Sequence, residues 1–150
     1  MITTRTQSPE ETLALGRRLA GVLLPGDVVL LDGRLGTGKT LLTSGIAQGL
    51  GIAGPVSSPT FVIARVYRDG LLPLVHADVY RLGSMLEFED LDLEETAANG
   101  VLVIEWGEAV EGSVSADRLV VEIEIAGETE RVVRFIPCGS WQDRSLEGVV

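Results

Sequence analysis

One octapeptide, GRLGTGKT at Gly33–Thr40, restricts the fold more than any other part of the sequence. It matches the phosphate-loop pattern G-x-x-x-x-G-K-[ST], and a chance match somewhere in a chain of this composition comes to about 0.2%. Its glycines let the backbone curl so that successive N–H groups point inward at an anion, and the helix that follows adds the positive end of its dipole. The pattern therefore predicts a strand, an anion-binding loop and a helix, in that order.

Two residues of this phosphate loop have side chains suited to nucleotide chemistry. Lys39 would place a compact charge on the β and γ phosphates, and the Thr40 hydroxyl would bind Mg²⁺. Lys39 is the only lysine of the chain, beside eleven arginines. An alternative is a glycine-rich turn that merely caps a helix, but such a turn needs neither the lysine nor three glycines. We therefore predict a nucleoside triphosphate with Mg²⁺ as the ligand, bound at a loop that faces solvent.

Apolar runs on both sides of the phosphate loop predict an α/β fold. Val28–Leu31 and Val101–Ile104 are continuously apolar, which is typical of strands buried on both faces, and we expect them to lie side by side. Ser8 with Glu11 predicts a capped helix that runs to about Leu23. A second helix should cover Leu41–Leu50 and end at a glycine. An acidic helical stretch, Glu87–Glu95, is most simply a solvated helix face, although it could bind a metal or a basic partner.

Two antiparallel hairpins are predicted beside the central strands. Phe61–Tyr67 and Leu71–Ala77 flank an Asp-Gly pair, the strongest short hairpin signal. Leu119–Ile125 alternates with polar neighbours and should pair with Thr129–Ile136. These segments predict a single-domain P-loop NTPase over residues 1–150, with a central, mainly parallel sheet flanked by helices and added antiparallel hairpins. Only the ends, residues 1–7 and about 139–150, look loosely held.

Composition narrows the class of protein further. The chain has 45% hydrophobic and 23% charged residues, as ordinary globular proteins do, and a formal net charge of -10. This charge argues against an extended nucleic-acid surface, so any nucleic acid would be held by a partner. No segment approaches the ~20 apolar residues of a membrane span, and no signal peptide is visible, so we expect no membrane contact and a cytoplasmic location. The single cysteine, Cys138, is interpreted as incidental.

Residues near the ends of predicted strands are candidates for the rest of the site. Glu105 directly follows an apolar strand, so it should reach the sheet edge of the phosphate loop and hold Mg²⁺; a solvent-facing acid is the alternative. Asp78 could orient an attacking water or bind a metal-held water, and His76 could be a hydrogen-bonded strand residue. Trp106 is interpreted as a packing or interface residue rather than one that stacks on a base.

Four segments, in this order and at these spacings, resemble the bacterial TsaE (YjeE) family, the ATPase component of tRNA threonylcarbamoyladenosine biosynthesis. They are GRLGTGKT, SSPTF at Ser57–Phe61, HADVYRL at His76–Leu82 and VIEW at Val103–Trp106. The first motif is common to all P-loop NTPases, whereas the other three are specific. The likeness covers about residues 8–107, and Arg34 departs from it because the family usually carries an acid there.

The resemblance implies a small α/β ATPase with ATP and Mg²⁺ as cofactors. Thr40 and Glu105 would bind Mg²⁺. The implied catalytic residues are Asp78, Thr60 and Lys39, the first two near the γ phosphate. The adenine would lie near the start of the first helix. The residues expected to bind the nucleotide are Gly33, Leu35, Gly36, Thr37, Gly38, Lys39, Thr40, Leu41 and Pro9.

The resemblance also implies a partner system. In the family, ATP binding and hydrolysis are thought to drive the cycle of a complex of TsaB with TsaD, which transfers a threonylcarbamoyl group to an adenosine next to the anticodon of tRNA. The chain itself would be a weak ATPase that serves tRNA only indirectly.

Three alternatives share the phosphate loop. A GTPase normally reads guanine through N-K-x-D, a string that this sequence lacks. A small-molecule or nucleoside kinase would need an acceptor pocket and usually a lid that carries arginine. A nucleotide-gated interaction module would scarcely hydrolyse ATP, and its role overlaps with that of the family.

Overall fold

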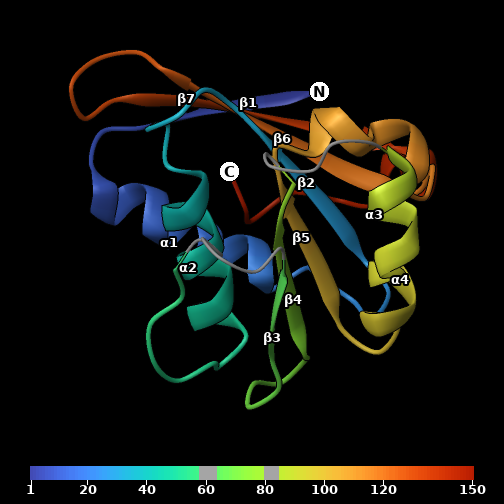
Figure 1. The fold of residues 1–150 in the computed structure, drawn as a ribbon. Helices are drawn as coiled ribbons and strands as arrows, with labels where there is room; N and C mark the ends of the chain where they lie inside the picture. The colour runs from blue at the N-terminus through green and yellow to red at the C-terminus, as the bar shows by residue number, and fades with distance from the viewer. Residues whose placement is uncertain (58–63, 80–84) are drawn as a thin grey trace.

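The computed structural model describes residues 1–57, 64–79 and 85–150. Within them, seven strands form one sheet in the order β1-β7-β6-β2-β5-β4-β3 (Figure 1). The strands are β1 (Ile2–Thr6), β2 (Val28–Asp32), β3 (Ala64–Tyr67), β4 (Leu74–Asp78), β5 (Val101–Glu105), β6 (Arg118–Ile125) and β7 (Arg131–Cys138). The central strands β6, β2, β5 and β4 run parallel, and the outer pairings are antiparallel. The predicted mainly parallel sheet with added hairpins is confirmed.

Helices cover both faces of this sheet. They are α1 (Pro9–Ala20), α2 (Lys39–Gly49), α3 (Met85–Leu91) and α4 (Leu93–Thr96), with 3-10 helices η1 (Gly107–Ser113) and η2 (Gly139–Asp143). Figure 1 shows α1 and α2 on one face and α3 and α4 on the other. Alternate residues of β2 belong to two cores, Val29 and Leu31 on the α1–α2 side and Val28 and Leu30 on the other. In the described ranges, no helix has the length and apolar character needed to cross a bilayer.

The parallel register of the central strands sets the geometry of the site. Val29 of β2 lies opposite Val103 of β5, as predicted for neighbouring buried strands. β5 also pairs with β4, so that Asp78 is the register partner of Glu105. Because parallel strands end at the same edge, the phosphate loop after β2 and both carboxylates lie at one edge of the sheet.

Helix α1 begins and packs in ways that the sequence predicted only in part. The Ser8 hydroxyl accepts a hydrogen bond from the Glu11 N–H at 3.1 Å, which confirms the cap, but the Glu11 carboxylate reaches Gln7 N at 2.6 Å instead of the Ser8 amide. The α-helix ends at Ala20, before the predicted Leu23, because the N–H groups of residues 21–23 bond to carbonyls three residues back instead of four.

Glycines let α1 approach α2 closely. A Cβ at Gly16 would lie 2.4 Å from the Leu42 carbonyl oxygen, and one at Gly45 would lie 2.2 Å from that of Leu13. Real Cβ atoms do not approach oxygen so closely, so only glycine fits these positions. The contact holds α2, whose first residue is Lys39, firmly against α1.

The middle hairpin differs from the prediction at its turn. Tyr67 pairs with Leu74, so six residues connect β3 to β4 rather than an Asp-Gly pair alone. Asp69 accepts a hydrogen bond from Ala53 N at 3.2 Å, and Leu71 N donates to the Leu50 carbonyl at 2.6 Å. The connection is longer because it docks on the end of α2. Residues 61–63 of the predicted first strand lie outside the described residues.

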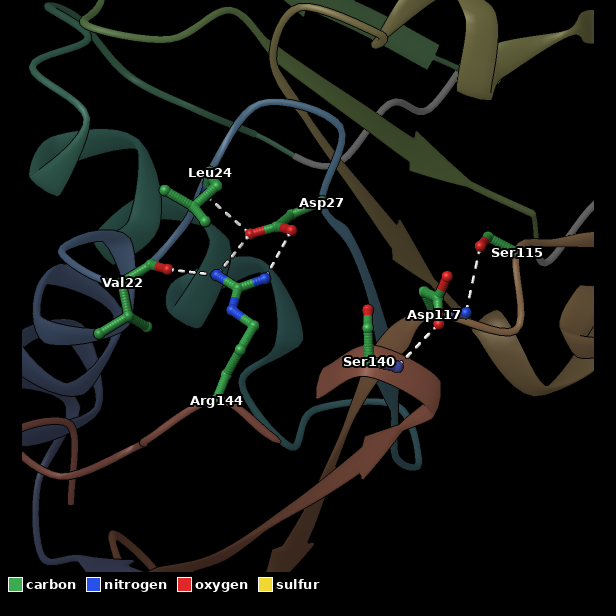
Figure 2. A network of polar contacts seen from close by, with 7 residues as sticks. All are labelled: Val22, Leu24, Asp27, Ser115, Asp117, Ser140 and Arg144. Carbon is green, nitrogen blue, oxygen red and sulfur yellow. Dashed lines mark hydrogen bonds and ion pairs between the residues drawn. The ribbon is translucent and has the colours of Figure 1, made fainter. Parts of the chain in front are cut away.

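The chain ends are packed into the fold, contrary to the prediction that they are loosely held. Residues 2–6 form β1, which pairs with β7 along its length. At the other end, Trp141, Leu146 and Val149 are buried in the core on the α1–α2 side. Arg144 binds Asp27 through both carboxylate oxygens (Figure 2). These long-range contacts hold the C-terminal tail against the fold, and no local pattern in its sequence predicts them.

Candidate functional site

The phosphate loop connects β2 to α2. Gly36 and Gly38 have φ angles of 82° and 108°, a left-handed conformation that residues with a Cβ rarely adopt. Gly38 is the N-cap of α2, where no side chain accepts a hydrogen bond, and the first turn of α2 contains no acidic residue. The start of this helix thus presents its backbone N–H groups and its positive dipole end to an anion.

Lys39 is buried, although its loop faces solvent at Arg34, Leu35 and Gly36 as expected. The residue is 5% exposed, and its Nζ donates to the carbonyl oxygens of Gly33 at 2.5 Å and Arg34 at 3.1 Å. The ammonium also lies 3.9 Å from the centre of the Trp106 ring. Trp106 reaches this place because its backbone has a φ angle of 63° directly after β5. Its ring therefore holds a cation beside the phosphate loop, a role that the sequence prediction of packing did not include.

Thr40 and Glu105, the predicted magnesium ligands, are in contact. The Thr40 hydroxyl lies 3.1 Å from both carboxylate oxygens of Glu105. Glu105 is 3% exposed, so the alternative of a solvent-facing acid is wrong. His76, which is fully buried, places Nε2 at 2.5 Å from Glu105 Oε2. The predicted hydrogen-bonded strand histidine thus contacts the carboxylate that is predicted to hold the metal.

Most of the predicted site residues line one cavity of about 320 Å³. The described residues that line it are Leu35, Gly36, Thr37, Gly38, Lys39, Thr40, Leu41, Asp78, Glu105 and Trp106. Two predicted residues are not among them: Pro9 forms the first turn of α1, and Gly33 lines a neighbouring cavity. Thr60 lies outside the described residues. The cavity is large enough for a small-molecule ligand and combines backbone N–H groups, one ammonium and two carboxylates.

A larger cavity, of about 690 Å³, adjoins the phosphate loop at Gly33 and Arg34. Its lining includes Arg34, Glu122 and Arg134, and it shares Thr37 and Trp106 with the smaller cavity. Neither Thr40 nor Glu105 lines it. Since those two predicted metal ligands line only the smaller cavity, the smaller cavity is the candidate site.

One residue near the phosphate loop was missed by the sequence analysis. Arg131, the first residue of β7, donates from Nε to the Thr37 carbonyl at 2.9 Å. These two residues are 94 positions apart in the sequence, and no local pattern around Arg131 points to the phosphate loop. Only the antiparallel β6–β7 hairpin brings it there.

The residues of the smaller cavity fit magnesium in their chemistry. Thr40, Glu105 and Asp78 offer hydroxyl and carboxylate oxygens, which are the ligands of Mg²⁺ in phosphate sites. Within the described residues, no group of three His, Cys, Asp or Glu could hold a metal ion. Mg²⁺ usually binds through one or two protein groups together with phosphate oxygens, so this donor set suits it when a nucleotide is bound.

Comparison with known proteins gives one consistent family. Residues 6–133 match the family described as threonylcarbamoyl adenosine biosynthesis protein TsaE. A protein of Bacillus subtilis (strain 168), named tRNA threonylcarbamoyladenosine biosynthesis protein TsaE, is 46% identical over 137 residues, 91% of this chain and 85% of the relative. The relative of that name from Streptomyces coelicolor is 52% identical over 127 residues, 81% of this chain and 85% of its own.

A solved structure agrees with the sequence comparison. The crystal structure of YdiB from Bacillus subtilis superposes with a TM-score of 0.79 at 38% identity, covering 95% of this chain and 89% of that one. The family match also extends past residue 107, where the sequence motifs end, and includes most of the β6–β7 hairpin. On these matches the chain belongs to the TsaE family.

Proposed function

We propose that this chain is a Mg²⁺-dependent ATPase of the P-loop NTPase class. The observation that carries the proposal is the contact of the Thr40 hydroxyl with both oxygens of Glu105, next to the buried Lys39. In P-loop NTPases, a hydroxyl at the start of the helix and an acid at the end of a neighbouring strand together hold the metal. A glycine-rich helix cap alone would not require these three side chains.

Each residue of the site has a defined task in this proposal. The phosphate loop N–H groups and Lys39 bind the phosphates, and Thr40 and Glu105 hold the metal. Asp78, the register partner of Glu105, orients the attacking water, and Thr60 acts near the γ phosphate. When bound, Mg²⁺ offsets the charge on the phosphate oxygens. The Trp106 ring limits access of water to Lys39, which strengthens the attraction of its ammonium for phosphate.

The names of the relatives support a role in tRNA threonylcarbamoyladenosine biosynthesis. We propose that the chain drives the cycle of a TsaB–TsaD complex in the cytoplasm and meets tRNA only through that complex. Its net charge of -10 suits an indirect role, because phosphate backbones are repelled by most of its surface. Its turnover in isolation would be slow.

A metabolite kinase is the alternative that a specific observation favours. The 690 Å³ cavity beside the phosphate loop has the size of an acceptor pocket and contains two arginines, Arg34 and Arg134. A kinase would transfer phosphate rapidly to a small molecule without any partner protein.

Nucleotide consumption with and without the partner pair tests the proposal. ATP turnover is measured for the chain alone, with TsaB and TsaD, and with a panel of metabolites. We expect slow Mg²⁺-dependent release of phosphate from the isolated chain and a higher rate with the partner pair. Rapid phosphorylation of a metabolite by the chain alone would overturn the proposal in favour of the kinase.

A further inference from the structure

The guanidinium group of Arg131 joins the β6–β7 hairpin to the phosphate loop. On the loop side, Nε donates to the Thr37 carbonyl at 2.9 Å and Nη2 to the Gly36 carbonyl at 3.4 Å. On the hairpin side, Nη1 donates to the carbonyl oxygens of Gly127, Glu128 and Glu130. All five contacts of this side chain are therefore with backbone oxygens.

These contacts determine how the peptide groups of the phosphate loop are oriented. In a trans peptide group, the carbonyl oxygen and the following N–H point in opposite directions. Since the Thr37 carbonyl is directed at Arg131, the Gly38 N–H is turned away from it. The Thr37 N–H closes a turn on the Arg34 carbonyl at 3.3 Å. Arg131 thus restrains the glycine-rich part of the loop, where a peptide could otherwise rotate easily.

An ordinary structural role for Arg131 would be an ion pair. Among the described residues, no carboxylate lies within ion-pair distance of its guanidinium, whereas Arg5, on the adjacent strand β1, pairs with Glu130 at 3.6 Å. Arg131 forms the hairpin contacts and the loop contacts with different nitrogens. The planar fork of arginine can reach both sides at once, and the single ammonium of a lysine cannot.

We propose that Arg131 is a positioning residue for triphosphate binding, so that the C-terminal hairpin forms part of the nucleotide site. It holds the carbonyl groups of Gly36 and Thr37 in the orientation that turns the Gly38 N–H toward the phosphates. This inference rests on the proposed function, because it assumes that a triphosphate occupies the phosphate loop.

The test compares Arg131→Gln and Arg131→Lys with a matched control, Arg5→Gln. Arg5 also carries one positive charge at this end of the hairpin, but it forms an ion pair with Glu130 and not a contact with the phosphate loop. Calorimetric titrations measure Kd for ATP and for adenosine, and thermal unfolding measures Tm for each variant. Lys39→Ala is included because it tests the proposed function separately.

We expect both Arg131 variants to bind ATP about tenfold more weakly, while adenosine binding changes less than about twofold and Arg5→Gln resembles the parent. The lysine variant keeps the charge and loses the fork, so parent-like ATP binding by Arg131→Lys would overturn the inference. A lower Tm of Arg131→Gln with unchanged ATP affinity would also overturn it and leave a hairpin role only. If Lys39→Ala binds ATP normally, the proposed function itself fails.

Discussion

Two carboxylates at opposite ends of the central strands are held in different ways. Asp27, just before β2, receives Arg144 Nη1 on one oxygen at 2.7 Å and Nη2 on the other at 2.9 Å. Glu105, at the end of β5, receives the Thr40 hydroxyl at 3.1 Å and the His76 imidazole at 2.5 Å. The first carboxylate faces a fixed cation, whereas the second faces a hydroxyl and an imidazole.

The partners of Asp27 leave it little freedom. Arg144 also donates to the Val22 carbonyl at 2.5 Å, and Leu24 N donates to Asp27 at 2.7 Å (Figure 2). The Arg144 guanidinium also stacks at 3.6 Å on the ring of Trp141. The guanidinium of Arg144 donates to both carboxylate oxygens of Asp27, so each oxygen has a charged partner. It closes the C-terminal tail onto the fold, and with Leu24 N it occupies three of the roughly four lone-pair sites of Asp27.

The surroundings of Glu105 leave binding capacity. A carboxylate has about four lone-pair sites, and a hydroxyl at 3.1 Å is a weaker partner than a guanidinium. A divalent cation could therefore take Glu105 and Thr40 together as ligands, while His76 Nε2 keeps its 2.5 Å contact with Glu105 Oε2. The amino end of the central strands is closed by an ion pair, whereas we propose that the carboxyl end binds a ligand.

The largest expected effect is on ATP affinity and comes from a substitution at the carboxyl end of the central strands. Lys39→Ala removes the only ammonium of the phosphate loop, and we expect ATP affinity to fall about 100-fold or more. Thermal unfolding should change by only a few degrees, because the lost contacts include two hydrogen bonds to loop carbonyls and one ring contact rather than part of the apolar core. Titration calorimetry measures the ATP affinity, and thermal unfolding measures the Tm. If Lys39→Ala bound ATP as tightly as the parent, the proposed ligand-binding role of the carboxyl end would be wrong.

The next largest expected effect is on stability and comes from breaking the Arg144–Asp27 ion pair at the amino end of the central strands. Arg144→Met keeps an aliphatic stem against Trp141 and removes the ion pair with Asp27. Since the Arg144 side chain is 23% exposed, we expect a loss of about 2 kcal/mol in unfolding free energy, or roughly 4–8 °C in Tm. ATP affinity of the folded protein should stay within about twofold. Urea unfolding and calorimetry measure both, and a large loss of ATP affinity would show that the two ends are coupled.

The smallest effect is expected where the tail meets the turn before β6. Asp117 Oδ1 accepts a hydrogen bond from Ser140 N at 2.7 Å, shown in Figure 2. Asp117→Ala removes this exposed contact, so we expect a loss of about 1 kcal/mol and unchanged ATP binding. The same unfolding experiment checks it. A loss as large as that of Arg144→Met would mean that the tail is held mainly at its start.

The sequence predicted the residues at the carboxyl end of the central strands far better than the ion pair at their amino end. Lys39 and Thr40 belong to a local motif, and Glu105 could be placed because parallel strands share an edge. Asp27 and Arg144 are 117 positions apart, and a single acid or arginine in a loop carries no such rule. The tail was therefore predicted to be loose although it is packed. Arg131 was missed for the same reason.

Fold prediction succeeded where periodicity was strong. The continuous apolar strands β2 and β5 lie side by side as predicted, and the β6–β7 hairpin is present. The turn of the middle hairpin was predicted wrongly, because Asp69 has a tertiary partner, Ala53 N, that outweighs its local turn preference. The order of the remaining strands depends on tertiary contacts that the sequence does not display.

One paired measurement tests the contrast between the two ends most directly. Glu105→Gln and Asp27→Asn make the same change, carboxylate to amide, at each end. For both variants, ATP binding is titrated as a function of Mg²⁺ concentration, and Tm is measured beside the parent. We expect Glu105→Gln to need about tenfold more Mg²⁺ at nearly parental Tm, and Asp27→Asn to show parental Mg²⁺ dependence and a lower Tm. Parental Mg²⁺ dependence in Glu105→Gln would contradict this expectation.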